Sequence, residues 1–413
     1  MPRPSDAVLL AVALAAAGCE GPRLDASTVL QPIPAYALPA YTLDPAPLAT
    51  TLLVGFAGSA AGLTRPGFHL RYQYIAGVDA PNADCLAPGR AKAEGCGTAW
   101  WGAWQYDQDP PGAFVRGFVA DTETAGLVPM LTYYMILPAS GVAEGAPEVT
   151  QAATDPYFLR RYLNDFRFLL RQIGCHRALV HLEPDFWGYA QHAAIRAGGT
   201  AATLPAPVRI ANPVDCAGEA DTVAGLGRCM VTMVRKWAPN ARVGLHASGW
   251  ASGFDCILNR DASLDVAARA RETADFLDPA GAASSDFVVV DIADRDAGWR
   301  QSAGRDTWIN PTGALPSYAQ AFTWSRALAD RAGKPLLWWQ VPVGNMSLPD
   351  QPNAWKDNKV EYFFGHPGDV VASGAIGMAF GAGASGQTTP ETDGGLLWAL
   401  AAALHSAGGH PLP

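Results

Sequence analysis

Eight short apolar runs, each of strand length, recur along the chain from residue 51 onward. They are residues 51–56, 69–75, 127–136, 178–183, 242–247, 287–292, 335–341 and 375–380. Amphipathic stretches of helical length lie between most of them, at residues 155–174, 220–237, 262–277, 317–332, 357–373 and 394–406. Strands that alternate with helices pair in parallel through right-handed crossovers. With no Gly-rich dinucleotide turn after the first run, this pattern predicts an α/β fold, a single (β/α)8 barrel of the TIM type with long, Trp-rich loops.

The first connection is too short for this scheme. Only about a dozen residues, "AGSAAGLTRPGF", separate the first two runs, and they cannot hold a crossover helix. Either a loop replaces the first helix, or the run at 51–56 is an extra strand outside the barrel.

The N-terminus predicts export. The stretch "AVLLAVALAAAGCE" is an apolar segment that ends in small residues before Cys19. It resembles the bacterial lipoprotein signal, which implies that Ala16-Ala17-Gly18-Cys19 is the lipobox and that Cys19 is acylated. An ordinary secretory signal is the alternative. We therefore expect an outer-membrane or cell-surface lipoprotein, otherwise a periplasmic or secreted protein, that meets the membrane only through its lipid anchor.

The predicted domains follow from this boundary. Residues 1–19 form the signal, the Pro- and Ala-rich residues 20–50 form an extended tether, and residues 51–413 form the catalytic barrel. Six cysteines remain after Cys19, and an even number in an oxidising compartment indicates disulfides. Cys85 and Cys96 bracket one loop and are the best candidate pair. No CxxC spacing occurs, so we expect neither a zinc site nor a redox site.

Charge narrows the choice of partners. The formal net charge is −9, the isoelectric point is near 5.3, and no run of Lys or Arg occurs. A nucleic-acid partner requires a basic face, so this class is excluded. We expect a monomer that uses no cofactor and no metal.

Tryptophans concentrate where the loops after the predicted strands begin. Trp101, Trp187 and Trp250 follow three of the runs, and Trp339 lies within the seventh. The carboxyl ends of barrel strands build the active site, and aromatic faces stack on the apolar faces of sugar rings. This distribution predicts a poly- or oligosaccharide ligand.

The fourth run ends in two carboxylates, in the stretch "LVHLEPDFWGY". Side chains alternate along a strand, so His181 and Glu183 are expected to share a face that points into the barrel mouth. A Glu that is partly desolvated there has a raised pKa and is suited to act as a general acid. Asp185 is expected about 6–7 Å away, which suits the second acid of an inverting pair. Its alternative role is a helix N-cap.

Glu183-Pro184 after a fourth barrel strand resembles the retaining glycoside hydrolases with (β/α)8 barrels. The resemblance implies that Glu183 is the acid/base and that a second Glu ends the seventh strand as nucleophile. The chain differs from that pattern at two positions. Leu182 stands where the family has Asn, and Gln340 stands at the nucleophile position and cannot attack an anomeric carbon.

The second acid must then come from elsewhere. Asp291 closes the strongly apolar run at 287–292 and is the best candidate, because an ionisable group there needs a partner or a function. Glu391 and Asp393 after the eighth run are the next option, with Asp393 also suited to cap the last helix. The charged cluster at 294–296 is expected to be solvated or salt-bridged.

Other polar residues at strand ends are expected to bind hydroxyl groups of the substrate. They are His181, His246, Tyr133, Tyr134 and Gln340. A divalent metal held by Glu183, His181 and His246, and a phosphate held by the Gly-rich residues 381–389, are lesser alternatives.

Taken together, the sequence predicts an exported glycoside hydrolase, with Glu183 as proton donor, Asp291 or Asp185 as its partner, and Glu391 at the substrate. The alternative is a non-catalytic carbohydrate-binding surface lipoprotein on the same fold, which Gln340 motivates.

Overall fold

The computed structural model describes residues 49–76 and 112–413. Eight parallel strands close into one barrel in sequence order, with β8 paired to β1. The strands are β1 (Leu53–Phe56), β2 (Leu70–Ile75), β3 (Val128–Tyr133), β4 (Ala178–Leu182), β5 (Ala241–Ala247), β6 (Phe287–Asp291), β7 (Leu336–Val341) and β8 (Ala375–Phe380). The predicted single (β/α)8 barrel is confirmed.

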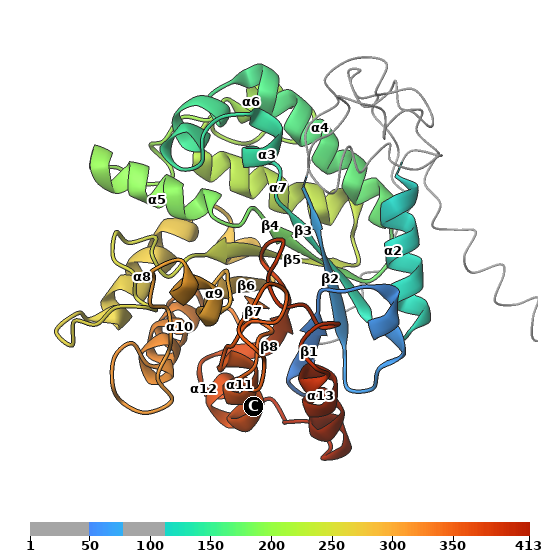
Figure 1. Ribbon diagram of the computed structural model, residues 1–413. Coiled ribbons are helices and arrows are strands. Elements are labelled where there is room, and N and C mark those ends of the chain that lie inside the picture. The colour runs from blue at the N-terminus through green and yellow to red at the C-terminus, as the bar shows by residue number, and fades with distance from the viewer. Residues whose placement is uncertain (1–48, 77–111) are drawn as a thin grey trace, which may run out of the picture.

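Helices surround the barrel (Figure 1). They are α2 (Ala113–Thr124), α3 (Ile136–Ser140), α4 (Pro156–Ile173), α5 (Phe186–Ala197), α6 (Val208–Ala211), α7 (Val223–Trp237), α8 (Val266–Leu277), α9 (Ala297–Ser302), α10 (Tyr318–Ala332), α11 (Lys359–Gly365), α12 (Pro367–Ala372) and α13 (Leu396–Ser406). Local signals fix the ends of α4: the Asp155 side chain accepts from Tyr157 N, Pro156 is the first helical residue, and Gly174 ends the helix. No helix of the described residues is long and apolar enough to cross a membrane.

The short first connection is a loop with one 3-10 turn, Ala60–Thr64, so a turn takes the place of the first helix. β1 pairs with both β2 and β8 and is a strand of the barrel. The rings of Phe56, Phe68 and Trp398 meet edge to face, with centroids 4.9–5.5 Å apart, so α13 covers β1 from outside. This packing buries the apolar face that a first helix would otherwise cover.

The core has two layers, which follow from the alternation of side chains along each strand. One set of alternate positions fills the barrel interior with bulky residues, among them Tyr72, Leu179, Phe287 and Trp339. The other set packs outward against the helices. A disulfide joins Cys216, in the segment before α7, to Cys229 within α7. The predicted pair Cys85 and Cys96, the predicted lipidation site Cys19 and Trp101 lie outside the described residues.

One buried carboxylate ties together the loops that follow β6, β7 and β8. Asp296 accepts from the backbone N–H of Gly344 at 3.0 Å and of Thr388 at 2.8 Å, and its own N–H donates to Gln387 Oε1 at 2.9 Å. Asp296 is 1% exposed. These bonds satisfy buried backbone donors that no water reaches, and they hold three rim loops in register.

Replacing Asp296 by Ala leaves the N–H groups of Gly344 and Thr388 buried without acceptors. We expect Asp296→Ala to lower the free energy of unfolding by about 2–4 kcal/mol, measured by urea denaturation. The matched control is Asp330→Ala, which removes an exposed carboxylate paired with Arg326 and is expected to cost less than about 0.5 kcal/mol. Equal losses in the two variants would contradict a loop-holding role for Asp296.

Candidate active site

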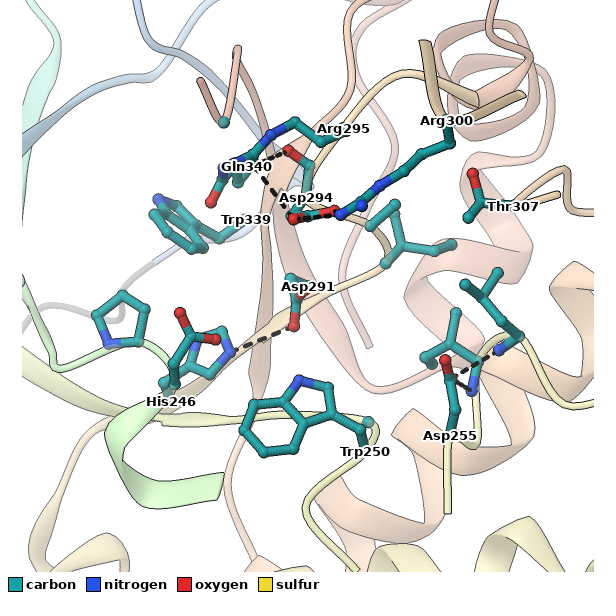
Figure 2. A pocket seen from close by; sticks show the side chains of 18 of the residues that line it. His246, Trp250, Asp255, Asp291, Asp294, Arg295, Arg300, Thr307, Trp339 and Gln340 are labelled. Atoms are coloured by element: carbon teal, nitrogen blue, oxygen red, sulfur yellow. Dashed lines mark hydrogen bonds and ion pairs between the residues drawn. The ribbon is translucent and has the colours of Figure 1, made fainter. Parts of the chain in front are cut away.

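A cavity of about 900 Å³ opens at the carboxyl ends of the strands (Figure 2). Side chains from β2 and from the ends of or loops after β3 to β8 line it. The lining includes Tyr74, Tyr134, Asp185, His246, Trp250, Asp291, Trp339, Gln340 and Gly383. This is the end of the barrel where such folds place their active sites.

Glu183 does not line this cavity, and the prediction that its carboxyl group points into the mouth is wrong. Glu183 is fully buried, and its Oε1 accepts from the backbone N–H of Met135 at 3.0 Å and of Ile136 at 3.3 Å. The prediction assumed extended backbone through residue 183, but Glu183 has a φ of 45°. The alternation of β4 therefore ends at Leu182, and the side chain turns toward the loop after β3.

Burial raises the pKa of Glu183 to about 8, against the hydrogen bonds from Met135, Tyr162 and Ile136, which lower it. A carboxyl group with this pKa is protonated and uncharged at neutral pH, which suits a fully buried position. Its function in the described structure is to hold the loop between β3 and α3.

Asp185 is the carboxylate of this segment that faces the cavity. Its φ of 69° continues the left-handed bend that begins at Glu183, and its side chain caps no backbone N–H of α5, so the N-cap alternative is not realised. The pKa of Asp185 is raised to about 6, mainly by burial; His246 lowers it, and Asp291, Glu144 and Asp294 raise it. Asp185 is thus suited to hold a proton at mildly acidic pH and to donate it near neutral pH.

Asp291 ends β6 and faces the same cavity in a different environment. Its Oδ1 lies 3.2 Å from His246 Nε2 (Figure 2), and its side chain is 24% exposed. A second imidazole lies behind the first: His246 Nδ1 is 3.1 Å from His181 Nε2, and His181 Nδ1 is 3.2 Å from Thr132 Oγ1. Four side chains from β3, β4, β5 and β6 thus form one row of polar contacts.

The carboxylate of Asp291, at the end of this row, determines which nitrogen of His246 carries a proton. An ionised carboxylate only accepts, so His246 Nε2 carries the proton toward Asp291. His246 Nδ1 and His181 Nε2 face each other at 3.1 Å, so one of them donates and the other accepts. Burial, and secondarily His246, lower the pKa of His181 well below its ordinary value, which keeps that ring neutral. The row therefore fixes the direction of the Asp291 carboxylate through its 3.2 Å contact with His246.

Aromatic rings line the cavity beside the two carboxylates. The Trp339 ring lies against Tyr74 and His181, with centroids 5.2 and 4.8 Å apart, and Trp250 packs on Tyr189 at 4.8 Å. Gln340 Oε1 accepts from the Tyr74 hydroxyl at 2.6 Å. Trp250, Trp339, Gln340 and His246 thus line the cavity, and their binding to a substrate stays a prediction.

Three other predicted binding residues do not line the cavity. Trp187 is 1% exposed and its indole N–H donates to Leu182 O at 2.9 Å, so its ring is buried in the core and does not face the cavity. Tyr133 points outward and donates to Asp165 Oδ2 at 2.7 Å. Glu391 accepts from Ser59 N at 3.0 Å, in the loop after β1, and stands outside the cavity lining. Asp393 caps α13 by accepting from Leu397 N at 2.7 Å.

His181 is also displaced from its predicted role, because it lies one layer below the cavity and contacts Thr132 and His246 instead. The metal site proposed for Glu183, His181 and His246 is not assembled, since Glu183 turns to the loop after β3. The described residues contain no group of three His, Cys, Asp or Glu side chains placed to hold a metal ion.

Several lining residues went unpredicted. Tyr74 is at an inward position of β2, two residues after Tyr72, and this spacing was the signal that could have found it. Tyr189, in the first turn of α5, and Glu144, whose Oε1 accepts from the Tyr189 hydroxyl at 2.7 Å, carry no such signal.

No protein-family model matches this chain, and no curated protein matches it. Solved structures with a similar chain path include a modular endo-β-1,4-mannanase from Cellulomonas fimi, with 14% identity, 86% of this chain and 70% of that chain covered, and a TM-score of 0.46. A broad-specificity endoglucanase from an uncultured bacterium has 13% identity, 82% and 81% coverage, and a TM-score of 0.41. A family 39 glycoside hydrolase from Bacteroides cellulosilyticus has 10% identity, 86% and 64% coverage, and a TM-score of 0.39.

These neighbours are glycoside hydrolases, and the chain resembles them. Identities and scores this low do not carry residue roles from one protein to another. The class of the site therefore rests on this chain alone: a (β/α)8 barrel with two carboxylates in one cavity.

The raised pKa of Asp185 has a consequence for stability that needs no substrate. A folded-state pKa of about 6, above the ordinary value of 3.8, favours folding below pH 4, and this contribution is lost as the pH rises through 6. As the pH rises from 4 to 8, the unmodified protein should therefore lose about 1–2 kcal/mol in free energy of unfolding relative to Asp185→Asn. Urea denaturation of both proteins at each pH measures this difference.

The exposed Asp330→Asn exchange is the control and should show a difference that stays within about 0.5 kcal/mol across that range. A flat difference for Asp185→Asn as well would contradict the raised pKa.

Proposed function

We propose that this protein is a glycoside hydrolase, with Asp185 as the proton donor and Asp291 as the carboxylate that acts at the anomeric carbon. The observation that carries the proposal is the contrast between two carboxylates that line one cavity. Burial raises the pKa of Asp185, while Asp291 is partly exposed and lies 3.2 Å from His246 Nε2. Paired carboxyl groups with environments that separate their protonation states are the requirement for cleaving a glycosidic bond.

The proposed reaction follows from these states. Asp185 transfers its proton to the glycosidic oxygen as the bond from that oxygen to the anomeric carbon breaks. Asp291 either attacks the anomeric carbon itself or removes a proton from the water that attacks it. In either route His246 keeps the carboxylate of Asp291 aligned through the 3.2 Å contact between Nε2 and Oδ1.

The rest of the cavity supports a sugar ligand. Its volume of about 900 Å³ falls within the range of sites for small molecules, ~300–1,000 Å³. Trp250 and Trp339 offer aromatic faces, and Gln340 and Tyr134 offer polar groups that suit hydroxyl groups of a sugar. We extend the proposal to an exported protein, anchored through Cys19, that acts on a poly- or oligosaccharide outside the cytoplasm.

Substitutions of the two acids test the assignment. We expect Asp185→Asn and Asp291→Asn each to lower the rate of release of reducing sugar by ~10²–10⁴-fold, because each removes one half of the acid–base pair. The measurement is made over a panel of neutral and acidic polysaccharides, with circular dichroism to confirm that each variant folds.

Two further variants serve as controls. Glu391→Gln changes an exposed carboxylate outside the cavity and should leave the rate unchanged. Glu183→Gln keeps an uncharged acceptor for Met135 and Ile136 and should lower the rate by less than ~10-fold. A larger loss in Glu183→Gln than in Asp185→Asn would return the acid role to Glu183. Retention of several glycans with no cleavage would favour the carbohydrate-binding alternative.

A further inference from the structure

A group of arginines lies on one side of the cavity. Arg295 and Arg300 both reach Asp294 (Figure 2): Arg295 Nη1 is 3.2 Å from Oδ2, and Arg300 Nη2 is 2.5 and 2.6 Å from the two carboxylate oxygens. Arg305, in the loop after α9, also lines the cavity. We call Arg295, Arg300 and Arg305 the arginine wall.

The wall carries excess positive charge. One carboxylate, Asp294, is shared between two guanidinium groups, so one positive charge remains uncompensated there. Among the described residues Arg305 has no ion pair, while the neighbouring Asp306 is paired with Arg260. The chain as a whole has a net charge of −9, so a positive region inside the cavity is a local feature that attracts anionic groups of a ligand.

The packing around Gly383 brings a further donor to the wall. A Cβ on Gly383 would lie 1.9 Å from Gln340 Nε2 and 2.8 Å from Arg295 Nη1, so only glycine lets both groups lie against this backbone. Gln340 Oε1 is occupied by the Tyr74 hydroxyl, which leaves Nε2 as the donor. Arg295 is held in place because its Nη1 donates to Asp294 O at 2.7 Å.

We propose that the substrate is an acidic saccharide and that the arginine wall, with Gln340 Nε2, binds an anionic group on one of its sugar units. The inference rests on the proposed function, because it names the substrate class of the same cavity. Guanidinium groups present planar pairs of N–H donors that match a carboxylate or a sulfate. The neutral hydroxyl groups of a sugar can be bound without the positive charge of an arginine.

The position of the wall also orients the chain of sugars. The cavity is also lined by Glu144, Asp255, Asp291 and Asp306, whose negative charges repel an anionic group. The anionic unit therefore binds at the wall, and the neighbouring glycosidic bond is presented to Asp185 and Asp291.

The test measures binding without turnover. Asp185→Asn protein is titrated calorimetrically with three oligosaccharides of similar length: one neutral, one built from uronates, and one neutral chain that carries sulfate esters. Adding Arg295→Gln or Arg300→Gln to this protein should weaken binding of an anionic oligosaccharide by about 10- to 100-fold. Adding Arg331→Gln, which removes an exposed arginine paired with Asp275 outside the cavity, should leave it unchanged.

The outcomes separate the two proposals. Arginine-dependent binding of the uronate chain, or of the sulfated chain, supports the subsite and identifies the anion, and it does so even if the unmodified protein cleaves nothing. The subsite is overturned if the neutral chain binds as tightly as, or more tightly than, both anionic chains. In that case, cleavage of the neutral chain by the unmodified protein would leave the hydrolase proposal standing. Equal losses in Arg295→Gln and Arg331→Gln would also overturn it.

Discussion

The site depends on a left-handed bend directly after β4. Glu183 and Asp185 both have positive φ angles, 45° and 69°, which cost non-glycine residues about 1–2 kcal/mol each. The bend is held from below, because the carboxyl group of Glu183 accepts from Met135 N and Ile136 N and the indole of Trp187 donates to Leu182 O. Without it the strand would continue extended and Asp185 would not enter the cavity.

The bend matters because it gives the cavity an acid without a partner. Asp185 gains no hydrogen bond from the described residues and is buried near other carboxylates, so its pKa rises to about 6. Asp291 instead lies 3.2 Å from His246 Nε2, and His181 and Thr132 continue the row behind that ring. One barrel thus gives two Asp side chains in the same cavity different environments by geometry alone, as the proposed acid–base pair requires.

The sequence was sufficient for the barrel because hydrophobic periodicity and parallel pairing depend on short-range pattern. The eight strand positions, the ends of α4 and the inward direction of His246 and Asp291 follow from it. Glu183 was assigned to the cavity by the same alternation and was wrong, because alternation fails where the backbone leaves the extended region. Trp187 and Tyr133 were wrong for a related reason: their polar tips bond Leu182 O and Asp165, contacts between segments that no local pattern encodes. Gln340 was correctly placed, yet its Tyr74 partner comes from the opposite end of the sequence.

The protonation of Asp185 in the folded protein is the central claim, and the carboxyl resonance of that residue tests it directly. The protein is labelled with ¹³C at aspartate side-chain carboxyl groups, and Asp185→Asn assigns the signal by its loss. The account predicts a titration midpoint near 6 for Asp185. A midpoint below 4, the range of a solvated aspartate, would show that burial does not raise the pKa of Asp185 and would contradict its role as proton donor.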